Sequence, residues 1–167
     1  MKNSFRYRRA LRFATKKHKG QFRMGGEPYV SHTIAVSEIL RGEGYGEDYL
    51  IAALFHDLLE DTDATDKQIR RIGGERVLEA VKLVTKEKGY SMADYIARIK
   101  KDPIAFAVKR ADRLHNLHCA VVAPEAFRRR YIAESREWYA DFSDEIVAAA
   151  DALETTLTDP ELESAKA

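Results

Sequence analysis

The chain has 167 residues, the usual size of one domain and enough to bury a hydrophobic core without disulfides. Its 28 basic and 27 acidic side chains give a net charge of +1, so no overall attraction to nucleic acid or to an anionic membrane is expected. One cysteine excludes an internal disulfide, and the absence of a signal-peptide core or an apolar run of ~18 residues predicts a cytoplasmic protein that does not span a membrane.

The sequence predicts an all-α protein, because Pro and Gly separate long stretches rich in Ala, Leu, Glu, Lys and Arg, and strand patterns are scarce. Helices are expected at 3–19, 31–41, 47–59, 65–72, 75–85, 91–101, 103–121 and 124–156, with a Gly-rich loop at 21–29. We expect one domain over residues 1–158, followed by a frayed tail at 159–167. The oligomeric state is left open.

The segment FHDLLEDTD concentrates ionisable residues within an apolar helical pattern, where bare carboxylates are costly to bury. On one continuous helix His56 would share a face with Glu60, and Asp57 with Asp61. Asp112 lies in a second such context, VKRADRLHNL. These groups need partners, and only folding can bring the two segments together.

A metal ion is one such partner. Imidazole and carboxylate together suit Mn²⁺, Fe²⁺ or Zn²⁺ in a site that keeps positions for water and substrate, and His32, His56, Asp57 and Asp112 supply four such ligands. A His-Asp dipeptide alone is common, and a lone buried histidine is more often merely hydrogen-bonded. The surrounding pattern therefore decides between the two interpretations.

That pattern, H…HD…D over three predicted helices, resembles the HD phosphohydrolase superfamily. The strings QFRMGGEPYVSH, ALFHDLLEDTDAT and VKRADRLHNL closely resemble the hydrolase domain of the RelA/SpoT family, which removes the 3′-pyrophosphate from the alarmones ppGpp and pppGpp. The similarity runs in order over about residues 5–143. With no synthetase sequence following, the resemblance implies a stand-alone small alarmone hydrolase of the metazoan SpoT homologue type, folded as a single-domain HD-type bundle of about eight helices.

By motif position, the resemblance assigns one metal ion, usually Mn²⁺, to four ligands: His32, His56, Asp57 and Asp112. Glu60 and Asp61 match the family's catalytic pair, which orients and deprotonates the attacking water. His115 is expected beside the site, whereas His18 and His118 are expected at the surface.

Four further positions match substrate contacts. Arg23 matches an arginine that stacks on or flanks the nucleobase, and Asn116 matches a residue that steadies the site and substrate. Lys88 falls near a phosphate-binding lysine, although Lys86 takes that place if the alignment slips. Ser135 matches a hydroxyl position that contacts phosphate in the long family members.

The expected partner is a nucleotide, ppGpp, pppGpp or a relative, hydrolysed to GDP and pyrophosphate in the case of ppGpp. Met24 stands where many family members carry lysine, which leaves open a phosphatase acting on NADPH or another 2′- or 3′-phosphorylated nucleotide. A non-catalytic metal-dependent sensor would have lost Glu60 or Asp61, and both are present. A dinuclear HD oxygenase would need further ligands, and residues 63–110 contain no histidine.

Overall fold

The computed structural model describes residues 4–158, which form the helices α1 to α10 and a short 3₁₀ helix, η1. Their bounds are α1 Phe5–Lys17, α2 Val30–Gly42, α3 Glu47–Phe55, α4 Leu58–Asp61, α5 Asp66–Gly73, α6 Glu75–Val84, α7 Met92–Lys100, α8 Pro103–Cys119, η1 Ala120–Val122, α9 Glu125–Trp138 and α10 Asp144–Glu154. These residues contain no β-strand, and the all-helical prediction is confirmed. None of their helices is long and apolar enough to cross a membrane. The predicted tail at 159–167 lies outside the described residues.

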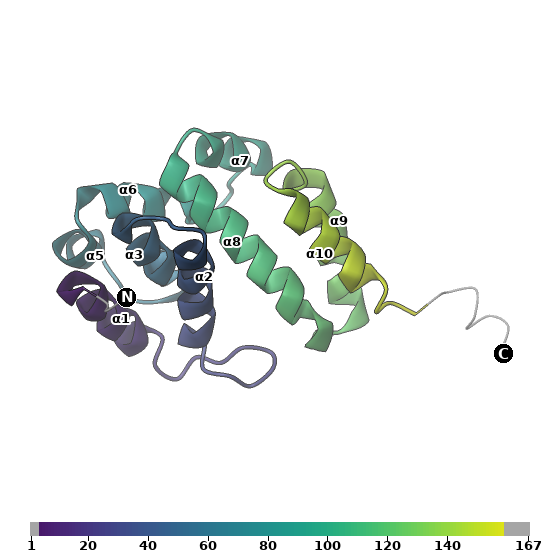
Figure 1. The fold of residues 1–167 in the computed structure, drawn as a ribbon, viewed down its shortest axis with the longest axis horizontal. Coiled ribbons are helices and arrows are strands. Elements are labelled where there is room, and N and C mark those ends of the chain that lie inside the picture. The colour runs from purple at the N-terminus through teal and green to yellow at the C-terminus, as the bar shows by residue number, and fades with distance from the viewer. Residues whose placement is uncertain (1–3, 159–167) are drawn as a thin grey trace, which may run out of the picture.

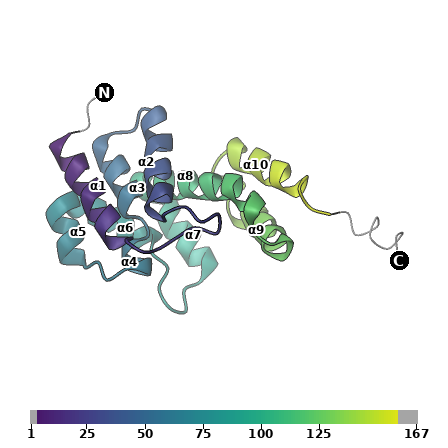
Figure 2. The ribbon, with the colours of Figure 1, turned by 90° about the horizontal axis from the view of Figure 1, so that it is seen from below.

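Helix α8 is the centre of the molecule. It crosses the middle of the fold, with α1 to α6 packed on one side and α9 and α10 on the other (Figures 1 and 2). Pro103 opens it and the Asp102 side chain accepts a hydrogen bond from the Ala105 amide, which satisfies a free N–H of the first turn. Because α8 is covered from two sides, Asp112 in its middle is buried.

The predicted helix 47–59 is interrupted at His56 and Asp57, giving α3 and α4. His56 Nδ1 lies 2.7 Å from the Ala53 carbonyl oxygen, the acceptor that the Asp57 amide would use in a continuous helix, and Asp57 has φ −100° and ψ 0°. Successive side chains on an unbroken helix point about 100° apart. The interruption instead lets His56 and Asp57 face the same point.

The predicted helix 124–156 is likewise two helices, α9 and α10, joined by a turn at 139–143. Tyr139 and Phe142 in the turn are buried, and α10 folds back against both α9 and α8. Ser143 stands at the N-cap of α10, ahead of two acidic residues in its first turn. This start signal was present in the sequence, but the continuous helical composition concealed it. The division of the predicted helices 47–59 and 124–156 into two each explains why the described residues form more α-helices than the eight expected.

Candidate metal centre and adjoining cavity

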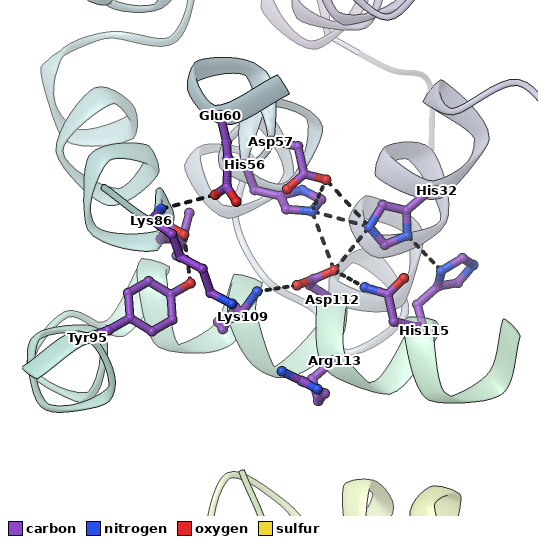
Figure 3. A network of polar contacts seen from close by, with 12 residues as sticks. His32, His56, Asp57, Glu60, Lys86, Tyr95, Lys109, Asp112, Arg113 and His115 are labelled. Atoms are coloured by element: carbon purple, nitrogen blue, oxygen red, sulfur yellow. Dashed lines mark hydrogen bonds and ion pairs between the residues drawn. The ribbon is translucent and has the colours of Figure 1, made fainter. Parts of the chain in front are cut away.

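Four side chains from three parts of the chain meet beside α8 (Figure 3). His32 comes from α2, His56 and Asp57 from the break between α3 and α4, and Asp112 from α8. The two imidazole Nε2 atoms are 3.3 Å apart. Asp57 Oδ2 lies 2.9 Å from His56 Nε2, and Asp112 Oδ1 lies 3.0 Å from His32 Nε2. The four predicted metal ligands thus converge on one point.

The hydrogen bonds behind the imidazoles fit a cation at that point. The Ala53 carbonyl can only accept, so in a neutral His56 ring Nδ1 carries the proton and the Nε2 lone pair faces Asp57 and Asp112. His32 Nδ1 lies 2.8 Å from His115 Nδ1, which can accept its proton and free Nε2 in the same way. Metal-binding histidines are commonly oriented by such a bond through the far nitrogen. His32, His56 and Asp57 offer ligand atoms that all lie within 4.8 Å of one another, a donor set suited to a divalent ion. Asp112 Oδ1 adds a second carboxylate, 3.0 and 3.5 Å from the two Nε2 atoms.

Lys109 compensates part of the buried negative charge. Its ammonium lies 2.7 Å from Asp112 Oδ2, and the two side chains are 13% and 5% exposed. Burial opposes ionisation of both groups, but their mutual attraction outweighs it, so the pKa of Lys109 is raised well above its usual value. For Asp112, Lys109 first, and then the nearby imidazoles of His32 and His56, lower the pKa well below its usual value. Asp112 is therefore held as a carboxylate.

Glu60 and Asp61 lie on α4, directly after the cluster. Glu60 Oε2 accepts a hydrogen bond of 3.0 Å from the backbone amide of Lys86, in the loop after α6 (Figure 3). Asp61 faces the loop between α1 and α2, where its backbone carbonyl accepts a bond of 2.7 Å from Gln21 Nε2. Burial, followed by the charges of Asp57 and Glu60, raises the pKa of Asp61. This shift brings the Asp61 carboxylate closer to the basicity that a proton acceptor needs.

A cavity of about 690 Å³ adjoins the cluster, between the loop 22–29 and the end of α8 with η1 and α9. Arg23 and Asn116 both line it. Arg23 donates to Asn116 Oδ1 at 2.7 Å, and Asn116 Nδ2 donates to Asp112 Oδ1 at 2.7 Å. This chain of bonds links the cavity wall to the candidate metal ligands. The two predicted substrate contacts thus lie together beside the site.

Ser135 does not line the cavity, although Tyr131, one turn earlier on α9, does, and a phosphate contact for Ser135 stays a prediction. It is fully buried on α9, where its hydroxyl donates to the Tyr131 carbonyl at 2.6 Å and lies 3.3 Å from the Arg113 guanidinium. Its hydrogen-bonding capacity is used inside the fold. Lys88 is exposed in the loop after α6, whereas Lys86 is half-buried, with its ammonium over the rings of Tyr90 and Tyr95.

The other histidines divide differently from the prediction. His115 is half-buried against His32 and His118 is exposed, both as expected. Burial, with the charges of His32 and Arg23, lowers the pKa of His115 to about 4. His18 was expected at the surface, but it is only 2% exposed and its ring lies 4.9 Å from that of Tyr29. That part of the prediction was wrong.

Comparison with known proteins identifies the family. A profile described as HD domain matches residues 10–145. The chain belongs to the HD domain family. A divalent metal ion is implied for HD domains, and the cluster of His32, His56 and Asp57 fits one.

Several relatives of this HD domain have assigned activities. The chain is 38% identical over 140 residues to a guanosine-3′,5′-bis(diphosphate) 3′-pyrophosphohydrolase of Aquifex aeolicus, covering 79% of this chain and 20% of the relative. It is 34% identical over 145 residues to the bifunctional (p)ppGpp synthase/hydrolase SpoT of Escherichia coli, covering 80% and 21%. The chain thus spans about one fifth of the length of these curated relatives.

Among solved structures, two similar chains are covered by this one over nearly their whole length. One is a metazoan ortholog of SpoT, described as hydrolysing ppGpp and acting in starvation responses. The likeness has a TM-score of 0.78 at 27% identity and covers 92% of this chain and 96% of that one. A second structure, from Listeria monocytogenes EGD-e, has a TM-score of 0.59 at 26% identity and covers 77% and 98%.

The sequence did not reveal the residues that support the HD cluster. Tyr29 donates a hydrogen bond of 2.7 Å to Asp57 Oδ2, and burial together with the Asp57 charge raises the pKa of Tyr29, so the hydroxyl keeps its proton. Tyr29 and Lys109 stand inside the strings that carried the resemblance, and a buried charge three residues before Asp112 was a signal for an ion pair. Gln21 opens one of these strings, but its role, like that of His18, depends on contacts that form only in the folded chain.

Proposed function

We propose that this protein is a metal-dependent phosphohydrolase that removes the 3′-pyrophosphate of ppGpp, yielding GDP and pyrophosphate. The observation that carries the proposal is the continuous connection from the cavity through Arg23 and Asn116 to Asp112 and the cluster of candidate ligands. A nucleoside in the cavity would lie next to the ligands that hold the ion. The names of the Aquifex aeolicus relative and of the metazoan structure support the same reaction.

In this proposal His32, His56, Asp57 and Asp112 hold one divalent ion, for which Mn²⁺ suits the mixed imidazole and carboxylate ligands. The ion supplies Lewis acidity toward the phosphoryl oxygens and lowers the pKa of water. Asp61 accepts the proton of the attacking water, aided by a raised pKa. Glu60, fixed by the Lys86 amide, orients that water.

Substrate binding falls to residues on two sides of the cluster. Arg23 lies with its guanidinium 5.7 Å from the centre of the Tyr29 ring at the cavity wall, and we assign it to the base. We assign the phosphates to Lys86 rather than to Lys88, because Lys86 is half-buried beside Glu60 and its side chain extends toward Lys109 (Figure 3). A lysine already held over aromatic rings loses less freedom on binding an anion than one exposed on a loop.

A second candidate substrate class is NADPH or another 2′- or 3′-phosphorylated nucleotide. Met24 lines the cavity and is 67% exposed, next to the apolar side chains of Phe22, Val121 and Val122. Such a wall accepts a purine ring by contact and offers few hydrogen bonds that distinguish guanine from adenine. This observation favours a broader choice of nucleobase than ppGpp alone.

The test is incubation of the purified protein with Mn²⁺ and ppGpp, with separation of GDP and pyrophosphate. NADPH is the competing substrate, and release of inorganic phosphate reports its hydrolysis. Rapid turnover of ppGpp supports the proposal, and turnover of NADPH alone selects the second candidate. If the protein binds a nucleotide but forms no product, it is a sensor and not an enzyme. If it neither binds nor hydrolyses any of these nucleotides, the proposal is overturned.

A further inference from the structure

His18 and Gln21 connect the end of α1 to the end of α4. His18, which follows the last residue of α1, lies with Nδ1 2.7 Å from Gln21 Oε1, and Gln21 Nε2 donates to the Asp61 carbonyl at 2.7 Å. Helix α4 has four residues, and Asp61 is its last. The carbonyl of a last helical residue has no partner within its own helix, so Gln21 supplies the bond that α4 cannot.

The chemistry of this connection fixes the orientation of every group in it. The Asp61 carbonyl can only accept, so the amide nitrogen of Gln21 must face it. The Gln21 oxygen then faces His18, and His18 must donate from Nδ1. In a neutral ring, His18 Nε2 then carries only a lone pair. Each of the three residues thus has one arrangement that satisfies both bonds.

His18 carries a cost that packing alone does not explain. It is 2% exposed, and none of the described residues offers its Nε2 atom a hydrogen bond. Leaving a buried polar atom without a partner costs about 1–3 kcal/mol, so an apolar residue of similar size would suit this position better for stability. The useful atom of His18 is therefore Nδ1, which leads through Gln21 to Asp61.

A second contact of His18 points to the same site. Its ring lies 4.9 Å from that of Tyr29, and the Tyr29 hydroxyl donates to Asp57 Oδ2. Tyr29 is itself tied to Gln21, whose backbone carbonyl accepts from the Tyr29 amide at 2.9 Å. The buried His18 ring thus contacts both Tyr29, which bonds to Asp57, and Gln21, which bonds to Asp61.

We infer that His18 and Gln21 are positioning residues that hold Asp61 where it accepts the proton of the attacking water. The inference rests on the proposed function, since it assigns a support to the proton acceptor of that reaction. Neither side chain lines the cavity, and the connection reaches the backbone of α4 at the Asp61 carbonyl. A displacement of about 1 Å at a reacting group can cost on the order of 100-fold in rate.

The first test replaces Gln21 by Met, which keeps the length of the side chain and removes both hydrogen bonds. Gln21→Met is expected to lower kcat for ppGpp by about 10- to 100-fold and to change KM by less than about 2-fold. The matched control is Gln68→Met, which removes a capping bond on α5. Gln68→Met should keep wild-type kcat.

Two measurements that do not depend on turnover accompany the kinetics. Hydrogen–deuterium exchange in peptides covering residues 58–64 should be faster in Gln21→Met and unchanged in Gln68→Met, because only the first releases the end of α4. Mn²⁺ should raise the melting temperature of both variants as much as it does for wild type, since the four ligands are intact. A lost Mn²⁺ response in Gln21→Met would overturn the inference in favour of a general disruption of the site.

The His18 variants separate positioning from packing. His18→Asn keeps a donor near the place of Nδ1, whereas His18→Leu fills the space without one. We expect His18→Asn to retain several-fold more kcat than His18→Leu, while His18→Leu melts no lower than His18→Asn. Equal kcat in the two, or wild-type kcat in Gln21→Met, would overturn the inference alone. An inactive wild type would instead overturn the proposed function, and the inference with it.

Discussion

Lys109 offers the most direct test of the charge balance in the cluster. Its ammonium lies 2.7 Å from Asp112 Oδ2, and both side chains are almost wholly removed from water. Lys109→Met keeps most of the apolar stem and deletes the charge, leaving the Asp112 carboxylate without its cation. Removing one partner of a buried ion pair costs about 3–5 kcal/mol, because the remaining charge stays buried and uncompensated.

The expected loss is large enough to measure by thermal unfolding. At ~2–4 °C per kcal/mol for a chain of this size, metal-free Lys109→Met should melt roughly 6–20 °C below wild type. Lys82→Met is the matched control, since Lys82 forms a 3.0 Å pair with Asp66 in which both side chains are about half exposed. A surface pair contributes about 0–1 kcal/mol, so the control should lose no more than ~4 °C.

Chelation and metal addition test the same reasoning from the other side. In Lys109→Met a bound divalent ion would neutralise the Asp112 charge in place of the missing ammonium. Adding Mn²⁺ should therefore raise the melting temperature of metal-free Lys109→Met by more than it raises that of EDTA-treated wild type. The double variant Lys109→Met with Asp112→Asn, which removes both charges, should be more stable without metal than Lys109→Met. If metal-free Lys109→Met melted within about 2 °C of Lys82→Met, the charge argument would be refuted.

Three further predictions concern the division of roles. Asp61→Asn should lower kcat by at least about 100-fold and keep the Mn²⁺-induced thermal shift. Asp57→Asn should lose both activity and shift, because Asp57, unlike Asp61, lies among the candidate ligands. Equal behaviour of the two variants in both assays would contradict this division. Met24→Lys should raise kcat/KM for ppGpp relative to NADPH several-fold by adding a cation to the cavity wall, and an unchanged ratio would remove Met24 from substrate choice. Ser135→Ala should destabilise the fold by about 1–3 kcal/mol in denaturant and leave KM within about 2-fold, and a large rise in KM would support its predicted phosphate contact.

The sequence allowed the candidate metal ligands to be named but did not predict how they come together. His56 and Asp57 were recognisable because two metal-binding types stand together in a specific string, and this information is local. Periodicity predicted one continuous helix through them, because a repeat of 3.6 records which residues are apolar and not which carbonyl a side chain will occupy. The bond from His56 to Ala53 breaks that helix, and it is this break that brings the two side chains to one point.

Supporting residues were harder to predict for a different reason. The supporting residues are of ordinary types, and their roles depend on what they contact. Tyr29 bonds to Asp57, 28 positions away, and Gln21 to Asp61, 40 positions away. Lys109 and His18 each bond to a residue 3 positions away, Asp112 and Gln21. The Lys109–Asp112 pair is local, and helical spacing alone would have found it. The bonds of Tyr29 to Asp57 and of Gln21 to Asp61 become visible only once the loop 18–29 is seen to pack against the two ends of α4. The bond between His18 and Gln21 is short in sequence but depends on the conformation of the same loop.

For Ser135, the match by motif position and the side of the helix on which it lies point to different roles. Tyr131, Ser135 and Tyr139 recur at intervals of four. Tyr131 and Ser135 therefore share one side of α9, and Tyr139, which directly follows the helix, continues that side. In the structure that side faces α8, where the Arg113 guanidinium lies 4.2 Å from the Tyr131 ring centre and 3.9 Å from that of Tyr139. A hydroxyl between two aromatic rings on a helix is placed to satisfy a buried cation. Tyr131 lines the cavity from the same side of α9, whereas Ser135 is fully buried beneath it, so the burial of the single side chain bears on whether a substrate reaches it.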